Sequence, residues 1–311
     1  MTDEFSSLEE FDRFVESLDG NETEDLKIKT LSNSFLVDPS LLSMPDDPFS
    51  SSYRDAVLRI HAAVSGRPSY DVTTMEHTPL DVDAEIETPS VYRFDGEWLG
   101  NYLESFAHVI RRLNVRPGMR VVELGCGDAE ISLHLARLGC DVTLIDIEPD
   151  YLAIVQRKAV RLGVSVTTIC APFANAVEHG PFERAFFYQA FHHDLDHQSL
   201  VASFCDLLTA DGEVVLAGEP VIDPDGPWAR AVPYPWGPRL DGLSLRAMRT
   251  HGWMELGFHK EYFTELVNRN GWTASFETSD TNNLVSSIAL RREVPDDPLG
   301  AMRRFRGRLR G

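Results

Sequence analysis

The sequence predicts an α/β protein with a seven-stranded, mostly parallel sheet flanked by helices and preceded by an N-terminal extension. Short apolar strand patterns alternate with amphipathic helix patterns from residue 96 to residue 291. Such alternation is typical of a parallel sheet covered by helices. The 311 residues are 43% hydrophobic, which is enough for one sizeable core and an extension.

The extension comprises residues 1–95. Its first fifty residues carry thirteen acidic and three basic side chains, and their weak periodicity predicts a partly disordered stretch with room for one helix. Residues 52–65 read as a helix that ends at Gly66. The Pro-, Thr- and Asp-rich residues 67–95 are expected to run over the surface of the core.

The domain at 96–291 begins with a helix predicted over 96–113, because its apolar residues form a helical stripe. Gly139 and Gly163 stop two further helices, the second of which starts at Pro149. Helices are also expected near 197–208 and 259–269. The predicted strands lie at 120–124, 141–146, 164–169, 185–188, 213–217, 272–277 and 284–290.

Residues 218–258 lack a strong period and form an insertion in this domain. A long irregular connection inside a compact domain is frequently functional, often as a lid. The alternative is a small satellite core whose aromatic residues are buried for packing alone.

Composition narrows the class of partner and the compartment. The net charge is −20, and such a field repels phosphate backbones and anionic lipids, so neither nucleic acid nor a membrane is expected as a partner. The chain has no apolar run of about 18 residues and its start lacks the basic and apolar regions of a secretory signal, so a cytoplasmic location is expected. The four cysteines have no C-x-x-C spacing and read as reduced thiols.

The tail at 292–311 is basic, with five arginines and no acidic residue in its last ten residues. It reads as a solvated tail, or as a segment that docks on acidic surface of the same or another subunit of a homo-oligomer.

The most informative residues are Val121-Val-Glu-Leu-Gly-Cys-Gly-Asp-Ala129, a strand that runs into small residues and then a helix. This arrangement lets a ligand approach the backbone beside a positive helix N-terminus. Dinucleotide enzymes have a third glycine where this chain has Glu130, and a carboxylate there would repel a pyrophosphate. Asp146 ends the second strand 21 residues after Gly125, where an acid can accept both hydroxyls of a ribose.

These residues resemble the E-x-G-x-G motif of class I S-adenosylmethionine-dependent methyltransferases, which have a Rossmann-like fold. The resemblance covers about residues 96–291 and implies S-adenosyl-L-methionine as the cofactor. It assigns the cofactor to the following residues: Glu123 near the amino end, Gly125, Cys126 and Gly127 along the methionine part, Asp146 on the ribose, Ile147 and Ala171 at the adenine, and Gln189 beside the cofactor.

The segment after the fourth strand resembles the family's segment that ends in a histidine. His193 or His192 is therefore expected to face the transferred methyl group as a base, with Glu219 after strand five as the alternative base. Each histidine could instead bond a neighbouring loop carbonyl. A zinc site from His192, His193 and His197 is disfavoured, because neighbouring histidines seldom point at one metal; no metal is expected.

The acceptor is expected to be a sugar or glycan hydroxyl. Glu219-Pro220, Pro235-Trp-Gly-Pro-Arg-Leu-Asp-Gly242 and Gly252-Trp-Met-Glu-Leu-Gly-Phe258 look like methyltransferase domains associated with polysaccharide biosynthesis. Trp236 would lie on a sugar ring, and Arg239 and Asp241 would read its hydroxyls. The rival interpretations are O- or N-methylation of a small natural product, a protein that binds the cofactor without chemistry, and an NAD oxidoreductase, against which Glu130 argues.

Overall fold

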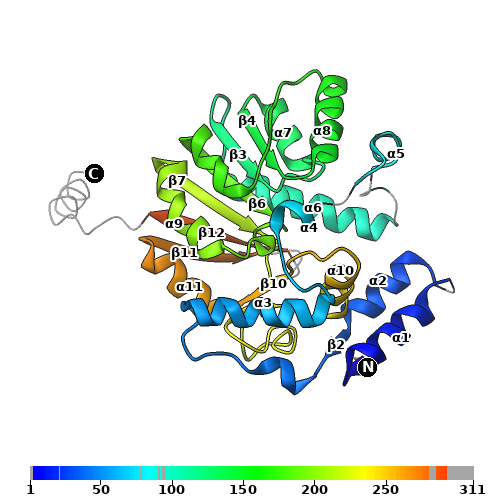
Figure 1. Cartoon of the computed structure of the whole chain (residues 1–311). Helices are drawn as coiled ribbons and strands as arrows, with labels where there is room; N and C mark the ends of the chain where they lie inside the picture. The colour runs from blue at the N-terminus through cyan, green and yellow to red at the C-terminus, as the bar shows by residue number, and fades with distance from the viewer. Residues whose placement is uncertain are drawn as a thin grey trace.

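A seven-stranded sheet forms the centre of the computed structural model, which describes residues 3–292 apart from 21, 78, 90, 91, 93, 94 and 280–284 (Figure 1). The strand order is β11-β12-β7-β6-β3-β4-β5, and β12 runs antiparallel to both of its neighbours. The strands are β3 (Arg120–Leu124), β4 (Asp141–Asp146), β5 (Thr167–Cys170), β6 (Phe182–Tyr188), β7 (Leu208–Ala217), β11 (Trp272–Thr278) and β12 (Ser286–Arg292). The predicted seven-stranded, mostly parallel sheet is confirmed.

Helices cover both faces of this sheet, and local sequence signals set their ends. Asp95 caps α6 (Gly96–Leu113) by accepting from the backbone N–H of Trp98. Gly139 and Gly163 adopt left-handed conformations that end α7 (Glu130–Leu138) and α8 (Pro149–Leu162). The second face carries α9 (His197–Leu207) and α11 (Lys260–Arg269).

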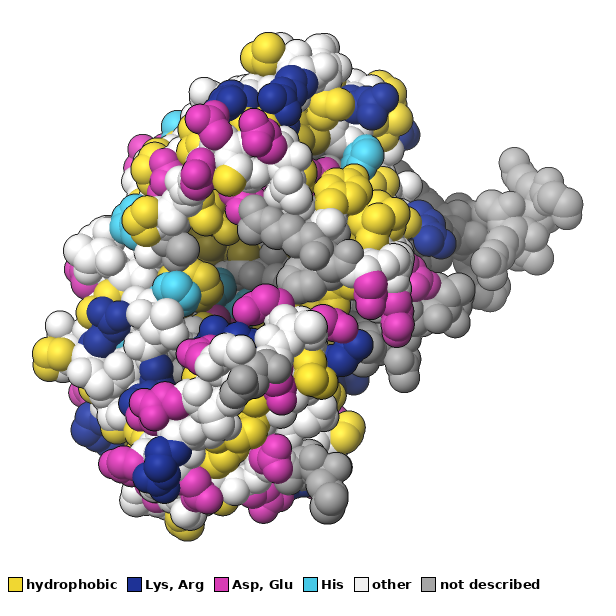
Figure 2. Space-filling view, turned by 90° about the vertical axis from the view of Figure 1, so that its right-hand side faces the viewer, with side chains coloured by type: hydrophobic (Ala, Val, Ile, Leu, Met, Phe, Trp, Pro, Cys, Tyr) yellow, Lys and Arg dark blue, Asp and Glu magenta, His cyan; other side chains and the backbone are white. Residues whose placement is uncertain are grey.

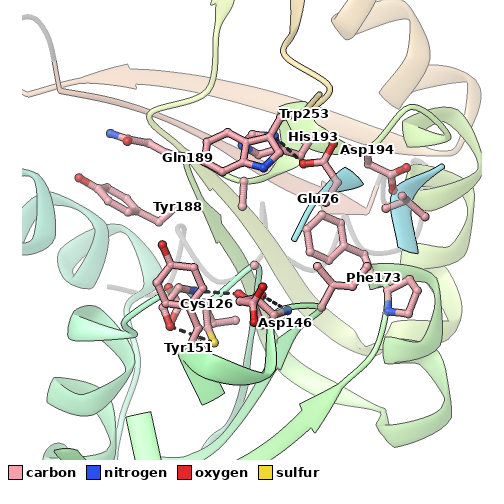
Figure 3. Close-up of a pocket in the computed structure, with 18 of the residues that line it drawn as sticks. Glu76, Cys126, Asp146, Tyr151, Phe173, Tyr188, Gln189, His193, Asp194 and Trp253 are labelled. Carbon is pink, nitrogen blue, oxygen red and sulfur yellow. Dashed lines mark hydrogen bonds and ion pairs between the residues drawn. The ribbon is translucent and has the colours of Figure 1, made fainter. Parts of the chain in front are cut away.

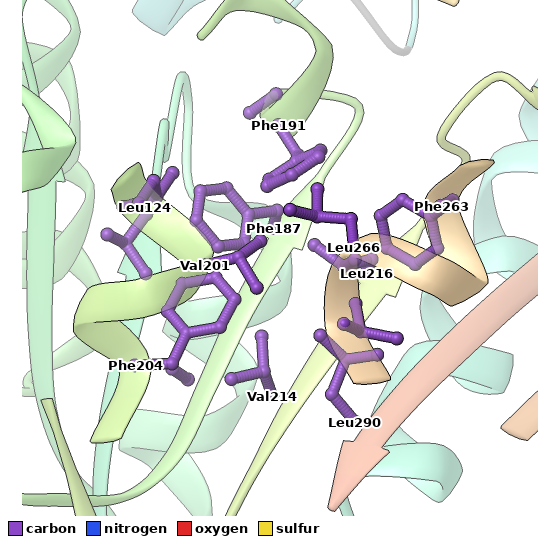
Figure 4. Close-up of a cluster of buried hydrophobic side chains, with 14 of the residues drawn as sticks. Leu124, Phe187, Phe191, Val201, Phe204, Val214, Leu216, Phe263, Leu266 and Leu290 are labelled. Carbon is purple, nitrogen blue, oxygen red and sulfur yellow. The ribbon is translucent and has the colours of Figure 1, made fainter. Parts of the chain in front are cut away.

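Two hydrophobic clusters lie on the two faces because successive strand residues point in opposite directions. Val121 and Phe186 pack with α6, α7 and α8. Val122 and Phe187 pack with α9 and α11 instead. Figure 4 shows the second cluster, in which Phe187 lies among side chains from α9, α11 and the neighbouring strands.

The N-terminal extension is more ordered than its composition predicted. Its described residues form β1 (Asp3–Phe5), α1 (Leu8–Leu18), α2 (Glu24–Ser32), β2 (Ser34–Leu36), η1 (Pro39–Leu42) and α3 (Ser51–Ser65). The first fifty residues were expected to be partly disordered with one helix, whereas their described part contains two α-helices; α3 matches the helix predicted over 52–65. In α1 the apolar residues Leu8, Phe11, Val15 and Leu18 recur at helical spacing, a local signal that the acidic composition masks. Phe11 packs with Leu31 and Phe35 on the insertion.

The insertion at 218–258 is a small folded unit. It contains β8 (Val221–Ile222), β9 (Trp236–Pro238), α10 (Gly242–Thr250) and β10 (Leu256–His259), and its strands form a separate sheet in the order β8-β10-β9. In Figure 1, α10 lies next to α2 and α3. The satellite-core alternative describes this segment better than an irregular lid.

The sequence also led to expectations about membrane-spanning segments and about the basic tail. Among the described residues, none of the helices combines the length and the apolar character that crossing a membrane requires. The arginine-rich end, residues 293–311, lies outside the residues that the structure describes.

We expect the substitution Trp236→Ala to lower the free energy of unfolding by about 3–5 kcal/mol, because a buried aromatic side chain would be replaced by a cavity. Trp236 is 1% exposed, whereas Trp228 in the same insertion is 45% exposed. Trp228→Ala is therefore the matched control and should cost much less. Urea unfolding of both variants measures the difference, and equal losses would contradict the packing role of Trp236.

Candidate active site

A cavity of about 910 Å³ opens at the carboxyl ends of β3, β4, β5 and β6 (Figure 3). Turns after these strands supply one wall, and α6, residues 70–85 and Trp253 supply the others. The lining includes Tyr70, Glu76, Tyr102, Phe106, Glu123, Gly125, Cys126, Gly127, Asp128, Glu130, Asp146, Ile147, Glu148, Tyr151, Pro172, Phe173, Tyr188, Gln189, His193, Asp194 and Trp253. Acidic side chains lie on both sides of this hollow in Figure 2.

The glycine turn after β3 brings the backbone to the cavity. Gly125 has a φ of 72°, and a Cβ built on it would lie 2.5 Å from the Cβ of Ala190. Gly127 also has a positive φ, of 47°, but open space surrounds its Cβ position. The turn therefore needs glycine at 125 for close packing, and it leaves the N-terminus of α7 accessible to a ligand.

Asp146 fixes this turn to the end of β4. Its Oδ2 accepts from the backbone N–H of Gly127 and its Oδ1 from that of Glu148, each at 2.9 Å. Burial raises the pKa of Asp146, and these two N–H donors oppose that rise. Each oxygen retains a lone pair, so the carboxylate is held in place with room to accept two ligand hydroxyls.

Glu123 presents an unsatisfied carboxylate oxygen to the cavity. Its Oε2 is buried and makes no well-formed hydrogen bond among the described residues, although the hydroxyl of Ser132 lies close enough to stabilise the carboxylate. Burial raises the pKa of Glu123 well above its ordinary range. A cationic group of a ligand would restore the charged form and supply the missing partner.

Lys158 on α8 holds the acidic rim at the start of α7. Its Nζ lies 2.6 Å from Oε1 of Glu130 and 3.3 Å from Oδ2 of Asp128. Glu130 therefore faces a lysine as well as the cavity. Even so, the carboxylates of this wall outnumber its one cation, which suits a positively charged ligand better than a pyrophosphate.

The far end of this wall is apolar. Ile147 and Tyr151 line it together with Pro172 and Phe173. The prediction that Ala171 contacts the adenine is corrected. Ala171 is absent from the described lining, and its N–H donates to the carbonyl of Asp146 at 3.0 Å. The residues after β5 that reach the cavity are the next ones along the chain.

The opposite wall carries Gln189 and His193, which follow β6. Gln189 has a φ of 53°. Nδ1 of His193 lies 3.3 Å from Oε2 of Glu76, as the dashed line in Figure 3 shows. Although burial alone would lower it, pairing with Glu76 and the charges of Glu255 and Glu219 raise the pKa of His193 to about 9.

Glu219 does not serve as a free base. Its Oε1 accepts from the N–H groups of Ala190 and Phe191, and its Oε2 accepts from the N–H and the Nδ1 of His192. Burial alone would raise the pKa of Glu219, but His192 and these N–H donors hold it below its ordinary value. His192 is absent from the described cavity lining, so both predicted alternatives to His193 support the chain behind it.

The three residues expected to bind the acceptor lie elsewhere, and these predictions are corrected. Trp236 is buried among Tyr53, His197 and Tyr262. Arg239 pairs with Glu255, and Asp241 caps α10. The insertion directs these aromatic and polar side chains into contacts with other residues of the protein. Composition alone does not show which way such side chains point.

His192, His193 and Glu255 could hold a metal ion, because their ligand atoms lie within 4.8 Å of one another. Arg239 donates to Oε2 of Glu255 at 2.6 Å. A guanidinium thus already supplies positive charge to this carboxylate. His197, the third histidine considered for zinc, instead contacts the hydroxyl of Tyr262 at 2.8 Å.

Sequence reasoning missed much of the cavity lining, including Tyr70 and Glu76 from the segment at 67–95 and Trp253 from the insertion. The segment carries no motif, and its place over the cavity depends on contacts with distant residues. Trp253 lies in the insertion, where no local pattern sets the direction of its side chain.

Residues 121–212 match the family model described as a methyltransferase domain. The chain therefore contains a methyltransferase domain over these residues. Ubiquinone biosynthesis O-methyltransferase of Burkholderia thailandensis is 29% identical over 116 residues, which are 37% of this chain and 47% of that protein. The Xanthomonas euvesicatoria pv. vesicatoria protein of the same name is 28% identical over 102 residues, 32% of this chain and 43% of that protein.

This methyltransferase chain thus spans less than half the length of these curated relatives. Among solved structures, magnesium protoporphyrin IX methyltransferase of Synechocystis PCC 6803 with bound S-adenosylmethionine has a TM-score of 0.50. The two chains are 16% identical, and the similarity covers 72% of this chain and 99% of that chain. At this identity the likeness shows a shared fold.

The cavity fits S-adenosylmethionine, which is the cofactor of the domain. The unsatisfied Oε2 of Glu123 suits the ammonium group. The held carboxylate of Asp146 suits the ribose hydroxyls, and the apolar end around Ile147 and Tyr151 suits the adenine.

We expect Asp146→Asn to raise the Kd for S-adenosylhomocysteine at least about tenfold, since each lost charge-assisted hydrogen bond costs about 1.5–3 kcal/mol. Isothermal titration calorimetry measures the change. Asp141→Asn is the control, because Asp141 starts the same strand and is exposed. A Kd for the Asp146 variant that stays within about twofold of the wild type would remove Asp146 from the binding site.

We expect His193 and His197 to titrate very differently. His193 should remain protonated up to about pH 9, whereas burial lowers the pKa of His197 to about 3 and should keep its ring neutral. The raised pKa of His193 contributes stability that is full below its unfolded value of about 6.5 and is lost as the pH rises through about 9. Histidine ¹⁵N NMR over a pH series measures both residues, and a His193 that titrates below 6.5 would refute this expectation.

Proposed function

We propose that the protein methylates a hydroxyl group of a small, largely apolar molecule and uses His193 as the general base. The observation that carries the proposal is the position of His193. It lies on the cavity wall opposite the Asp146 side, with its ring against that of Trp253, and its carbonyl accepts from the hydroxyl of Tyr70. No other described histidine lines the cavity.

The chain's own residues support a proton transfer. When bound, S-adenosylmethionine supplies a methyl group on a positively charged sulfur. As the methyl group moves from that sulfur to the acceptor oxygen, His193 would take the hydroxyl proton of the acceptor on a neutral ring nitrogen. Because only the neutral ring can accept a proton, turnover should rise with pH over the range in which His193 deprotonates.

The surroundings of His193 favour a small organic acceptor. Leu58, Leu195 and Leu200 line the cavity together with Tyr70 and Trp253. Polar side chains such as Arg54, Glu76 and Asp194 lie beside this apolar wall, and such a combination is typical of small-molecule sites. The names of the relatives, ubiquinone biosynthesis O-methyltransferases, agree with methyl transfer to an oxygen atom. The sugar hypothesis loses the support of Trp236, Arg239 and Asp241, which lie outside the described lining.

Transfer of a labelled methyl group tests the function directly. The protein is incubated with methyl-labelled S-adenosylmethionine and separate sets of catechols, amines and glycans. Label on the oxygen of a catechol supports the proposal, and label on glycans alone contradicts it. Tight cofactor binding without transfer to any acceptor would favour a non-catalytic binding protein.

We expect His193→Ala to lower kcat about 10²-fold or more while the Kd for the cofactor changes little, because the base acts on the acceptor proton. His134→Ala, at an exposed position on α7, is the control for removing an imidazole. Retained kcat together with a lower Tm would give His193 a structural role only.

A further inference from the structure

A segment of the N-terminal extension covers the cavity. We call residues 70–77 and 79–88 the cover segment; it contains α4 (Val72–Met75) and α5 (Val82–Glu87). Tyr70, Asp71, Val72, Glu76, Leu80 and Glu85 from this segment line the cavity. The segment thus contacts both the cofactor wall and the acceptor wall, whose residues are distant from it in the sequence.

On the cofactor wall, polar contacts hold the cover segment. Nδ1 of His77 lies 3.3 Å from Oε2 of Glu148, two residues after Asp146. The backbone N–H of Leu80 donates to Oδ2 of Asp150 at 3.0 Å. Further along, α5 packs against α8, and Arg157 pairs with Asp83 at 2.6 Å.

On the acceptor wall, Glu76 makes the corresponding contacts. Its Oε1 accepts from the hydroxyl of Tyr70 at 2.8 Å and from the backbone N–H of Met254 at 2.6 Å. Its Oε2 lies 3.3 Å from Nδ1 of His193, which is an ion-pair contact and not a hydrogen bond, so Nδ1 has no hydrogen-bond partner among the described residues. The carboxylate is only 8% exposed, so the ion pair is poorly screened by water.

We propose that Glu76 is the positioning residue for His193 and that the cover segment delivers it: the catalytic histidine is oriented and paired only while this segment lies closed over the cavity. The proposal rests on the proposed function. Glu76 and His77 are neighbours in the chain, yet they contact opposite walls. A single movement of the segment would therefore break the Glu76–His193 contact on the acceptor wall and the His77–Glu148 contact on the cofactor wall.

The other charged groups around His193 belong to the fixed scaffold. Glu219 is held by three backbone N–H groups and by His192. Glu255 is paired with Arg239. Of the three carboxylates that raise the pKa of His193, Glu76 alone comes from the cover segment. Closure of the cover segment would therefore place one additional negative charge, that of Glu76, beside His193.

The substitution Glu76→Gln tests the proposal without an acceptor. Glutamine keeps an Oε1 that can accept from Tyr70 and Met254, but it removes the negative charge beside His193. Histidine ¹⁵N NMR should then show the pKa of His193 lowered by about one unit or more, since an opposite charge at this distance typically shifts a pKa by about 1–3 units. An unchanged pKa in a folded Glu76→Gln protein would overturn the proposal.

Two further variants separate positioning from folding. Glu76→Asp retains the charge and should keep the pKa of His193 above its ordinary value. His77→Gln loosens the same segment on the other wall, so it should raise the Kd for S-adenosylhomocysteine a few-fold and lower the pKa of His193 by less than Glu76→Gln does. If His77→Gln lowers that pKa as much as Glu76→Gln does, the effect is general loosening and the proposal fails.

Kinetics provide the second readout once an acceptor is found. Glu76→Gln should lower kcat about tenfold or more and move the rising limb of the pH profile to lower pH, with a smaller change in the KM of the cofactor. Loss of Tm with an unmoved pH profile would indicate a merely structural residue. Absence of turnover by the wild type would contradict the proposed function, whereas the titration experiment would still decide the role of Glu76.

Discussion

The active site depends on the buried carboxylate of Glu219. It accepts from three successive backbone N–H groups after β6 and from the ring of His192. Burying this charge without such partners would be costly, and removing one partner of a buried ionic group typically costs about 3–5 kcal/mol. The interaction fixes the turn that presents Gln189 on one side and His193 on the other.

Close packing strengthens this constraint. A Cβ on Gly218 would lie 2.7 Å from the side chain of Gln189, and a Cβ on Gly125 would meet Ala190. The turns after β3, β6 and β7 therefore fit together only with glycine at these two places. The precision of the cavity comes from three strand ends that share one set of contacts, and from the carboxylate that satisfies their backbone groups.

The cofactor half of the site could be predicted from the sequence because its signals are local. Glu123, Gly125, Gly127 and Asp146 follow two adjacent strands, and parallel strands bring their carboxyl ends to one edge. The acceptor half could not be predicted in this way. Composition shows that Trp236 is aromatic but not which way it faces, and no local pattern brings Glu76 to a histidine more than a hundred residues away.

The hydrophobic core has a consequence for how such a chain can be divided. Tyr53 on α3 is fully buried among residues of the main domain, and its hydroxyl donates to the carbonyl of Trp236 at 3.0 Å. A chain that began at residue 96 would have a void under the insertion where Tyr53 packs. It would also lack the wall of the cavity that includes Tyr70. The insertion and the first 95 residues therefore depend on each other for packing. Exchanging the acceptor wall between related proteins would require moving both segments together.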